Sequence, residues 1–438
     1  MSNILVVYYY TRPHPPRASI RDHLDSFQRY SSHRCYYFNA ALSKRPWWTR
    51  AVDFDLVIFH TTLLGVRWNR PRFARLMDRL AWLGRLPAVK AMIPQDEFLS
   101  TDLLCQFIDR MNVGHVFSNA APEDWPVIYT GLNHRGVQFS QVLTGYLDDG
   151  ALKRINALAA RNPERPIDIG YRAWDAPAWL GRHGRLKTRI ARRVAARCRD
   201  TALTVDISTR PDDVLLGDDW YRFLLRCRYT IGVEGGASLL DRDGSVRAET
   251  EHYLADHPGI PFEQIEAACF PDRDNSLRLF VLSPRHLEAC ATRTCQILVS
   301  GQYNGILQAG RHYLELQPDF SNLDEVLAQF DDPQLRQEIT ERAYQDVVAS
   351  GRYSYRRFVE FVLQRSLGIG CEAESADKSF VRTGVSAWAR QTDRLGWNAI
   401  ALAAWGWQGL SRIGRVEDAR RTSAEQSAGG AARISVQS

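Results

Sequence analysis

The sequence predicts an α/β fold with two doubly wound halves that face each other across a cleft. Short apolar, β-rich segments alternate with amphipathic helical patterns through residues 1–150, which is typical of a parallel sheet covered by helices. A second alternating series begins at residue 167, after a polar stretch. Polar residues follow several of the strands, at the sheet edge where ligands of such folds bind.

In the first half, five apolar runs predict buried parallel strands over residues 4–10, 35–39, 56–60, 88–93 and 115–118. Helical patterns separate them: one starts near Ser19, a plausible N-cap, and others cover residues 70–83 and 101–111. We expect residues 1–150 to form a Rossmann-like domain, the first of two.

Residues 151–166 form a polar helix ending in Asn-Pro-Glu-Arg-Pro, which we interpret as a linker between domains. The second domain is expected over residues 167–367. Its strands are predicted at residues 167–171, 202–207, 229–233 and 296–299, and its helices at 186–198, 220–228, 286–292, 323–330, 332–350 and 353–367.

Residues 368–438 differ in character and are expected to be an extension. Residues 395–410 are apolar nearly all round, with three tryptophans and flanking arginines. A helix of this size spans about 24 Å, less than the roughly 30 Å hydrocarbon core of a membrane. It suits either the membrane interface or packing against the protein, and the small polar end after it is expected to be disordered.

Composition is that of an ordinary globular protein: of the 438 residues, 45% are hydrophobic and 24% charged. The net charge of +6 fits an enzyme of anionic substrates or an anionic membrane surface and does not require nucleic acid. Eight scattered cysteines without a Cys-x-x-Cys pair indicate reduced thiols. The chain enters a strand without a signal-peptide pattern, so we expect a cytoplasmic protein, peripheral at the inner membrane face if residues 395–410 bind there.

The most informative segment is residues 283–289, followed by the apolar run 295–299. It predicts a loop, a short helix that opens on Arg285 and His286, and a buried strand. Two cationic side chains at a helix N-terminus, with Glu288 one turn further on, suit a phosphorylated sugar nucleotide. Glu288 could accept hydrogen bonds from ribose hydroxyls, or it could simply complement the helix dipole.

Two further cations flank the first loop of the second half. Arg172 closes the strand 167–171, and Lys187 opens the helix after it. Fixed cations there could neutralise a leaving diphosphate. The alternative for Lys187 is a solvated basic face, because arginines crowd the same helix.

In the first half, Gln95-Asp96-Glu97 follows a buried strand at the edge facing the cleft. Asp96 or Glu97 could act as a base or bind acceptor hydroxyls, and an N-cap is the structural alternative for Asp96. His60, at the end of the preceding strand, is a third candidate.

The Arg-x-x-Glu-Ala element at residues 285–289, with its following strand, resembles the second domain of sugar-nucleotide-dependent glycosyltransferases of the GT-B fold. Gly170-Tyr171-Arg172 with Lys187 resembles the element that grips the donor diphosphate in that group. The resemblance covers roughly residues 1–350. It implies two Rossmann-like domains, a nucleotide-sugar donor contacted by Arg172, Lys187, Arg285, His286 and Glu288, and no metal or other cofactor.

The sequence departs from the Glu-x7-Glu pattern of many retaining members, since Phe280 stands eight residues before Glu288. Glu234 is the candidate for the missing acid, and Gly235 and Gly236 would let the backbone approach the sugar. The alternative is a tight turn without substrate. Inverting members place a histidine near the first helix, which makes His23 a candidate base, although a lone helical histidine is more often structural.

More narrowly, residues 21–24, 95–97, 169–172, 206–208 and 283–289 resemble glycosyltransferases found with bacterial surface-polysaccharide genes. This implies a glycan or lipid-linked acceptor, in assembly of O-antigen or a related polymer. Two alternatives stay open: a non-catalytic sugar-nucleotide binder or scaffold of the same fold, and a nucleic-acid binder using the basic helix 185–199. That helix lacks the interleaved aromatic residues of a base-stacking surface, so we expect no nucleic-acid partner.

Overall fold

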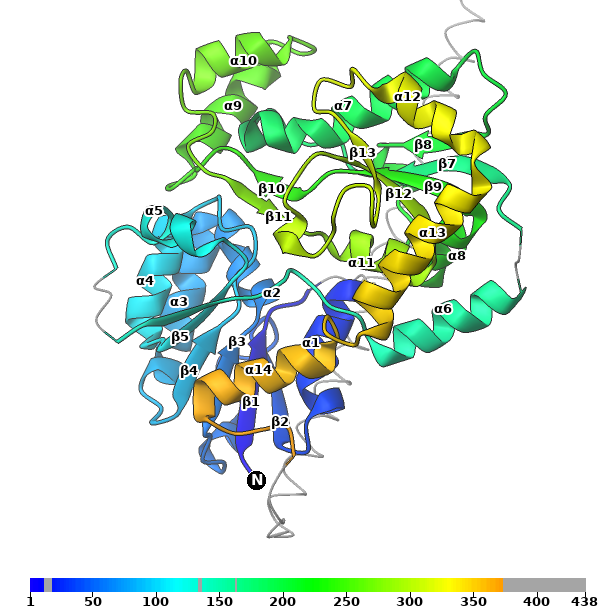
Figure 1. Ribbon diagram of the computed structural model, residues 1–438. Helices are drawn as coiled ribbons and strands as arrows, with labels where there is room; N and C mark the ends of the chain where they lie inside the picture. The colour runs from blue at the N-terminus through cyan, green and yellow to red at the C-terminus, as the bar shows by residue number, and fades with distance from the viewer. Residues whose placement is uncertain (12–17, 133–135, 162–163, 373–438) are drawn as a thin grey trace, which may run out of the picture.

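The computed structural model describes residues 1–11, 18–132, 136–161 and 164–372. It contains two parallel sheets, one above the other in Figure 1, with helices on both faces of each. The predicted fold class, two Rossmann-like domains in the GT-B arrangement, is confirmed by these sheets. The predicted helix over residues 395–410 lies outside the described residues.

The first sheet has the strand order β2-β1-β3-β4-β5-β6, and every neighbouring pair is parallel. Its strands are β1 (Asn3–Tyr8), β2 (Arg34–Asn39), β3 (Leu56–Phe59), β4 (Val89–Met92), β5 (His115–Ser118) and β6 (Gln138–Gln141). The last strand was not predicted, because its sequence Gln-Phe-Ser-Gln is half-exposed and gives no apolar run.

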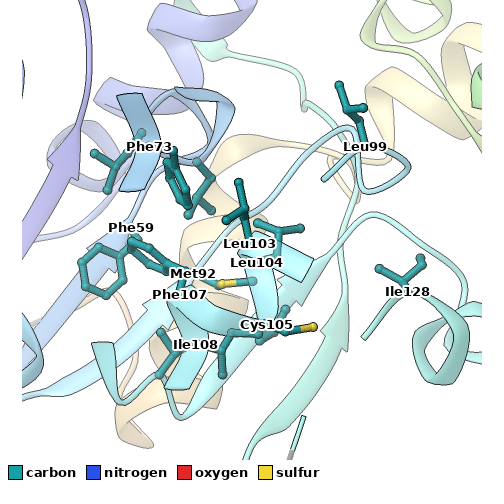
Figure 2. Close-up of a cluster of buried hydrophobic side chains, with 14 of the residues drawn as sticks. Phe59, Phe73, Met92, Leu99, Leu103, Leu104, Cys105, Phe107, Ile108 and Ile128 are labelled. Atoms are coloured by element: carbon teal, nitrogen blue, oxygen red, sulfur yellow. The ribbon is translucent and has the colours of Figure 1, made fainter. Parts of the chain in front are cut away.

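Side chains of β1 alternate between two cores, as a central strand requires. Leu5 and Val7 pack with α3 (Arg70–Gly84) and α4 (Thr101–Met111). Figure 2 shows this core, where Phe59 and Met92 of neighbouring strands meet Phe73 and Phe107 of these helices. Ile4 and Val6 pack instead with α1 (Ala18–Tyr30) and α14 (Tyr355–Leu367).

The second sheet is also parallel, in the order β13-β12-β9-β7-β8. Its strands are β7 (Ile167–Arg172), β8 (Val205–Ser208), β9 (Cys227–Gly232), β12 (Cys295–Val299) and β13 (Leu314–Leu316). One face packs against α7 (Gly181–Cys198), and the other against α8 (Asp218–Arg226), α11 (Pro284–Ala291) and the linker helix α6 (Asp149–Arg161).

Helix α14 differs from the prediction. The sequence placed residues 353–367 among the closing helices of the second domain, but the chain crosses back and α14 packs on the first sheet (orange, Figure 1). Phe358, Val359, Val362 and Leu363 complete the core beneath it. The remaining closing helices are α12 (Leu323–Ala328), α13 (Pro333–Ala343) and a π-helical turn, Tyr344–Ala349.

Residues 237–282 form an ordered insertion between β9 and β12. It contains α9 (Ser245–Asp256) and α10 (Phe262–Cys269), framed by the antiparallel pair β10 (Gly235–Ala237) and β11 (Leu279–Val281). The insertion joins the two domains: the Asp241 N–H donates to Phe98 O (2.8 Å), and the Ser100 N–H donates to Asp241 O (2.7 Å). Its apolar residues belong to the same core as α3 and α4.

No helix among the described residues has both the length and the apolar character needed to cross a membrane.

Candidate functional site

A cavity of about 360 Å³ opens at the carboxyl ends of β7 and β9. The end of β7, the end of β9, the loop before α8 and the start of α11 form its walls. A second cavity of about 160 Å³ adjoins it and shares Leu215, Trp220, Ser283 and Arg285 as walls. Ala18 and Ser19 of α1 close the second cavity from the first domain, so this smaller cavity lies between the domains. All wall residues of the larger cavity belong to the second domain.

Helix α11 begins as the sequence predicts. Ser283 is its N-cap, with a side chain that accepts a hydrogen bond from the Arg285 N–H, and Pro284 occupies the first turn. The predicted strand after it is β12, buried along its whole length. This local arrangement brings Arg285 and His286 to the wall of the larger cavity.

Arg285 and Lys187 supply the uncompensated positive charge of the site. Arg285 donates a hydrogen bond to the main-chain oxygen of Arg172, and its guanidinium lies 4.8 Å from the centre of the Trp220 ring. Lys187 projects from α7 into the same cavity. Burial lowers the pKa of Lys187, and Arg285 lowers it further, while Asp96 opposes both. Neither cation forms an ion pair with an acidic side chain in the described part of the chain.

Arg172 also lines the cavity, but its charge is already paired. Its guanidinium lies 2.8 Å from a carboxylate oxygen of Asp206, on the neighbouring strand β8, and 4.4 Å from the centre of the Phe223 ring. It also donates to the main-chain oxygens of Tyr171 and Asp206. The predicted diphosphate contact by Arg172 therefore competes with a carboxylate that the sequence did not single out.

Glu288 faces the smaller cavity, opposite Ala18 and Ser19. The Trp220 indole N–H donates to one of its carboxylate oxygens at 2.7 Å. Burial raises the pKa of Glu288 to about 7; Asp22 adds to this, while the Trp220 hydrogen bond and Arg285 oppose it. A carboxyl group with this pKa changes its charge near neutral pH.

His286 is buried and tied into the fold. Its ring nitrogens lie 3.0 Å from Gln296 Oε1 and 3.2 Å from Val233 O, which joins α11 to β12 and the end of β9. Burial lowers its pKa to about 4. The two hydrogen bonds to oxygen acceptors oppose this effect of burial. His286 borders the cavity, and its role as a second cation there stays a prediction.

Glu97 does not face the cleft, contrary to the prediction. It is fully buried, and its carboxylate accepts hydrogen bonds from Ser118 Oγ (2.6 Å), Asn119 N (2.7 Å) and Tyr129 OH (2.5 Å). With three donors inside the first domain, it serves that domain's structure.

His23 and His60 form a buried pair beneath α14, with 3.0 Å between His23 Nδ1 and His60 Nε2. The His23 ring packs edge-on against Tyr355 and also contacts Phe358. Burial lowers the pKa of His23 to about 4. The structural interpretation of His23 is therefore the correct one, and His60 serves as the N-cap of α2 (Thr61–Leu64).

Glu234 and the glycines after it also serve the fold. Glu234 is buried, and its carboxylate accepts a hydrogen bond from the Tyr303 N–H at 2.6 Å, which fixes the loop after β12. Gly235 and Gly236 pair with β11 in an antiparallel ladder. Gly236 has φ of +108°, and a Cβ there would lie 1.7 Å from Leu279 O, so the close approach is to backbone rather than to a sugar.

Asp96 differs from Glu97 in its exposure. It follows β4 and is the one exposed residue in the segment 95–100, where protein surrounds the carboxylate without covering it. That surrounding protein raises its pKa, while Arg67 and Lys187 lower it. Because Lys187 belongs to α7, this electrostatic interaction spans the cleft.

The sequence did not predict three residues that contact or surround the predicted site residues: Asp206, Trp220 and Arg67. Asp206 lies in a segment that the resemblance already included, so its position at a strand end beside Arg172 was a usable signal. Trp220 and Arg67 had no such signal, because their contacts are with residues distant in the chain.

No protein-family model matches this chain, and no curated protein matches it. Among solved structures, Anabaena HepE in complex with UDP is 10% identical and has a TM-score of 0.47, over 84% of this chain and 100% of that chain. Sucrose-phosphate synthase from Thermosynechococcus elongatus is 10% identical, with a TM-score of 0.46 over 83% of this chain and 98% of the other.

A trehalose 6-phosphate synthase from Burkholderia multivorans is 12% identical, with a TM-score of 0.44 over 84% of this chain and 97% of that one. Similarity at this level carries no argument about activity. The fold is established here by the strand order of the two sheets.

Proposed function

We propose that this protein is a glycosyltransferase that moves a sugar from a nucleotide-sugar donor to an acceptor hydroxyl. The observation that carries the proposal is the pair of adjoining cavities: Lys187 and Arg285 line the larger one, and Arg285 and Glu288 line the smaller one. Among the described residues, neither cation forms a salt bridge with a carboxylate. A diphosphate would supply negative charge that balances these two cations. It is also the leaving group, so negative charge grows on it as its bond to the sugar breaks.

We assign one part of the donor to each group of wall residues. Its diphosphate would lie between Lys187 and Arg285, with Glu288 accepting hydrogen bonds from ribose hydroxyls. Val214, Leu215 and the half-exposed Trp174 give the larger cavity an apolar border on which a base can pack.

Asp96 is our candidate for the acceptor side. In the transfer, the bond between the anomeric carbon and the diphosphate oxygen breaks, and a bond to the acceptor oxygen forms. The acceptor hydroxyl gives up its proton, and Asp96 is the cleft-facing carboxylate of the first domain that could receive it. Its raised pKa suits proton acceptance.

We further propose that the acceptor is a glycan or a lipid-linked saccharide and that the reaction belongs to bacterial surface-polysaccharide assembly. This finer assignment is supported by the sequence resemblance of residues 21–24, 95–97, 169–172, 206–208 and 283–289. It includes a cytoplasmic location at the inner membrane face.

A second candidate is a non-catalytic nucleotide-sugar binder of the same fold. It is favoured by the burial of His23, Glu97 and Glu234, which leaves Asp96 as the one predicted catalytic side chain that faces the cleft. Consumption of a nucleotide sugar in the presence of acceptor separates the two functions.

The first test is a thermal-shift titration with UDP and the other nucleoside diphosphates. Binding at a hundred times Kd adds about 2.7 kcal/mol of apparent stability, so at least one nucleotide should raise Tm by several degrees. A binding isotherm for the responding nucleotide checks that the shift reflects one site. Absence of any response, with inorganic phosphate as the matched anion, would remove the proposal.

Glu288 should make the folding stability of the protein depend on pH. Because the pKa of Glu288 in the folded protein, about 7, exceeds the ordinary value of 4.5, the folded chain holds this proton more tightly than the unfolded chain. The resulting stabilisation is complete below about pH 4.5 and is lost as the pH rises through 7. Glu288→Gln should therefore have its most favourable effect on Tm, relative to the parent protein, at pH 8 and its least favourable at pH 5.

The corresponding measurement is Tm against pH for both proteins without ligand. An equal difference in Tm at pH 5 and pH 8 would contradict this assignment of the titrating group.

A further inference from the structure

Arg67 is an unusual side chain for the interior of a domain. It lies in the 3-10 turn η2 (Gly65–Trp68), has no solvent exposure, and forms no salt bridge with any acidic side chain that the structure describes. Burial lowers its pKa, while the carboxylates of Asp96 and Glu97 raise it from a greater distance. A buried charge without a counterion is costly unless polar groups surround it. The polar groups here are main-chain carbonyl oxygens.

Four carbonyl oxygens accept hydrogen bonds from this guanidinium. Nε donates to Leu99 O (3.0 Å), and Nη1 donates to Leu64 O (3.0 Å). Nη2 donates to Gln95 O (2.8 Å) and to Asp96 O (2.5 Å). Three of these acceptors belong to one short segment, residues 95–100, which follows β4 and carries Asp96. We call it the 95–100 loop.

The backbone of the 95–100 loop would not adopt this shape without support. Asp96 has φ of +54° and Ser100 has φ of +50°. Both values lie in the left-handed region, which residues other than glycine seldom occupy. Such conformations persist where the surroundings over-determine them. Arg67 holds the loop from inside the first domain, while the insertion pairs with Phe98 and Ser100 from the other side.

Every other side chain of the loop is buried or tied down. Glu97 is bonded inside the first domain, Gln95 donates to Thr144 O at 2.8 Å, and the residues from Phe98 to Ser100 are buried. Asp96 is the one residue that the loop leaves exposed, and Lys187 of α7 lies near enough to lower the pKa of its carboxyl group. The contacts of the 95–100 loop therefore hold its backbone in place and leave one carboxylate, that of Asp96, exposed.

We propose that Arg67 is the positioning residue of Asp96: its four hydrogen bonds to carbonyl oxygens fix the 95–100 loop so that this carboxylate faces Lys187 across the cleft. The catalytic relevance of this role rests on the proposed function. The placement itself does not, and it can be measured without a nucleotide.

The test replaces Asp96 with a reporter whose charge depends on its neighbours. Asp96→Cys introduces a thiol at the tip of the loop, in a Cys371→Ser background, since Cys371 is half-buried while the seven other cysteines are buried. The rate of alkylation by iodoacetamide is followed against pH by mass spectrometry of the peptide that contains residue 96. A nearby ammonium group lowers a thiol's pKa and raises its reactivity near neutral pH.

With Arg67 in place, Lys187→Met should slow this alkylation at pH 7.5 by roughly three- to tenfold. In the Arg67→Met background, Lys187→Met should change the rate by less than about twofold, because the two residues act through the same placement. Arg70→Met is the matched control: Arg70 pairs with Asp102 near the surface of the same domain, and its loss should leave the Lys187 effect intact.

An equal Lys187 effect with and without Arg67, or no Lys187 effect in the parent, overturns the proposal. Arg67→Lys, which keeps the charge without the planar fork, serves as the second variant. Failure of both Arg67 variants to fold would also overturn it, since Arg67 would then be required by the whole domain rather than by this loop.

Nucleotide binding distinguishes this proposal from the proposed function. If UDP and the other nucleoside diphosphates fail to bind the parent protein while the thiol coupling is present, the placement by Arg67 stands and the glycosyltransferase assignment falls. If nucleotide binds and the coupling is absent, the reverse holds.

Discussion

Asp96→Asn is expected to lower sugar transfer by a hundredfold or more while leaving nucleotide binding intact. The substitution keeps the size of the side chain and removes its ability to accept a proton, a function worth about 10²- to 10⁴-fold in general base catalysis. Asp96 lies outside both cavity walls and acts on the donor site only through its charge near Lys187, so nucleotide affinity should change little. The measurement is the rate of nucleoside diphosphate release from a nucleotide sugar with acceptor present, beside the Kd for the nucleotide.

Asp102→Asn is the matched control, because this carboxylate belongs to α4 and pairs with Arg70 rather than facing Lys187. Transfer by Asp96→Asn at the parent rate would eliminate Asp96 as the base. A parallel loss of nucleotide affinity would instead place Asp96 in the donor site.

The second large effect is expected from the cations of the cavity. Lys187→Met and Arg285→Met should each weaken nucleoside diphosphate binding by about ten- to a hundredfold, since hydrogen bonds to charged groups contribute about 1.5–3 kcal/mol. Arg172→Met should have a smaller effect, because Asp206 already neutralises that guanidinium. Isothermal titration calorimetry with UDP, or with the nucleotide that responds best, gives the three dissociation constants.

Arg192→Met provides the control for net charge, because Arg192 lies on the same helix as Lys187 but is exposed and does not line the cavity. A loss of affinity in this variant equal to that of Lys187→Met would show that overall charge, rather than the cavity, binds the nucleotide. An Arg172→Met effect larger than the other two would restore Arg172 as the main diphosphate contact.

The fold was predictable because its central strands are buried on both sides and give continuous apolar runs. The same reasoning could not assign α14. Its pattern of Phe358, Val362 and Leu363 predicts an amphipathic helix, but an apolar stripe does not say which of two sheets it will cover. Strand β6 was missed for the opposite reason, since an edge strand that is half-exposed lacks the apolar run.

The sequence predicted which segments of the chain contribute to the candidate site better than it predicted which of their side chains do. Asp96 and Glu97 were adjacent candidates, yet one faces the cleft and the other is bonded inside the domain. The sequence does not show which of the two side chains is buried, because the left-handed backbone at position 96 changes the usual alternation of side-chain directions. Lys187 was a correct candidate for the cavity wall, but it does not open the helix as predicted, because α7 already begins at Gly181. The pairing of Arg172 depends on the neighbouring strand.

The return of α14 to the first sheet has a consequence for how the chain is made. The strands of that sheet leave the ribosome by residue 141, but the helix that seals one of their faces is completed only at residue 367. At about 5–20 residues per second, this interval lasts roughly 10–45 seconds. During translation one face of the amino-terminal sheet is therefore covered by α1 alone until the second domain has been synthesised and α14 follows it.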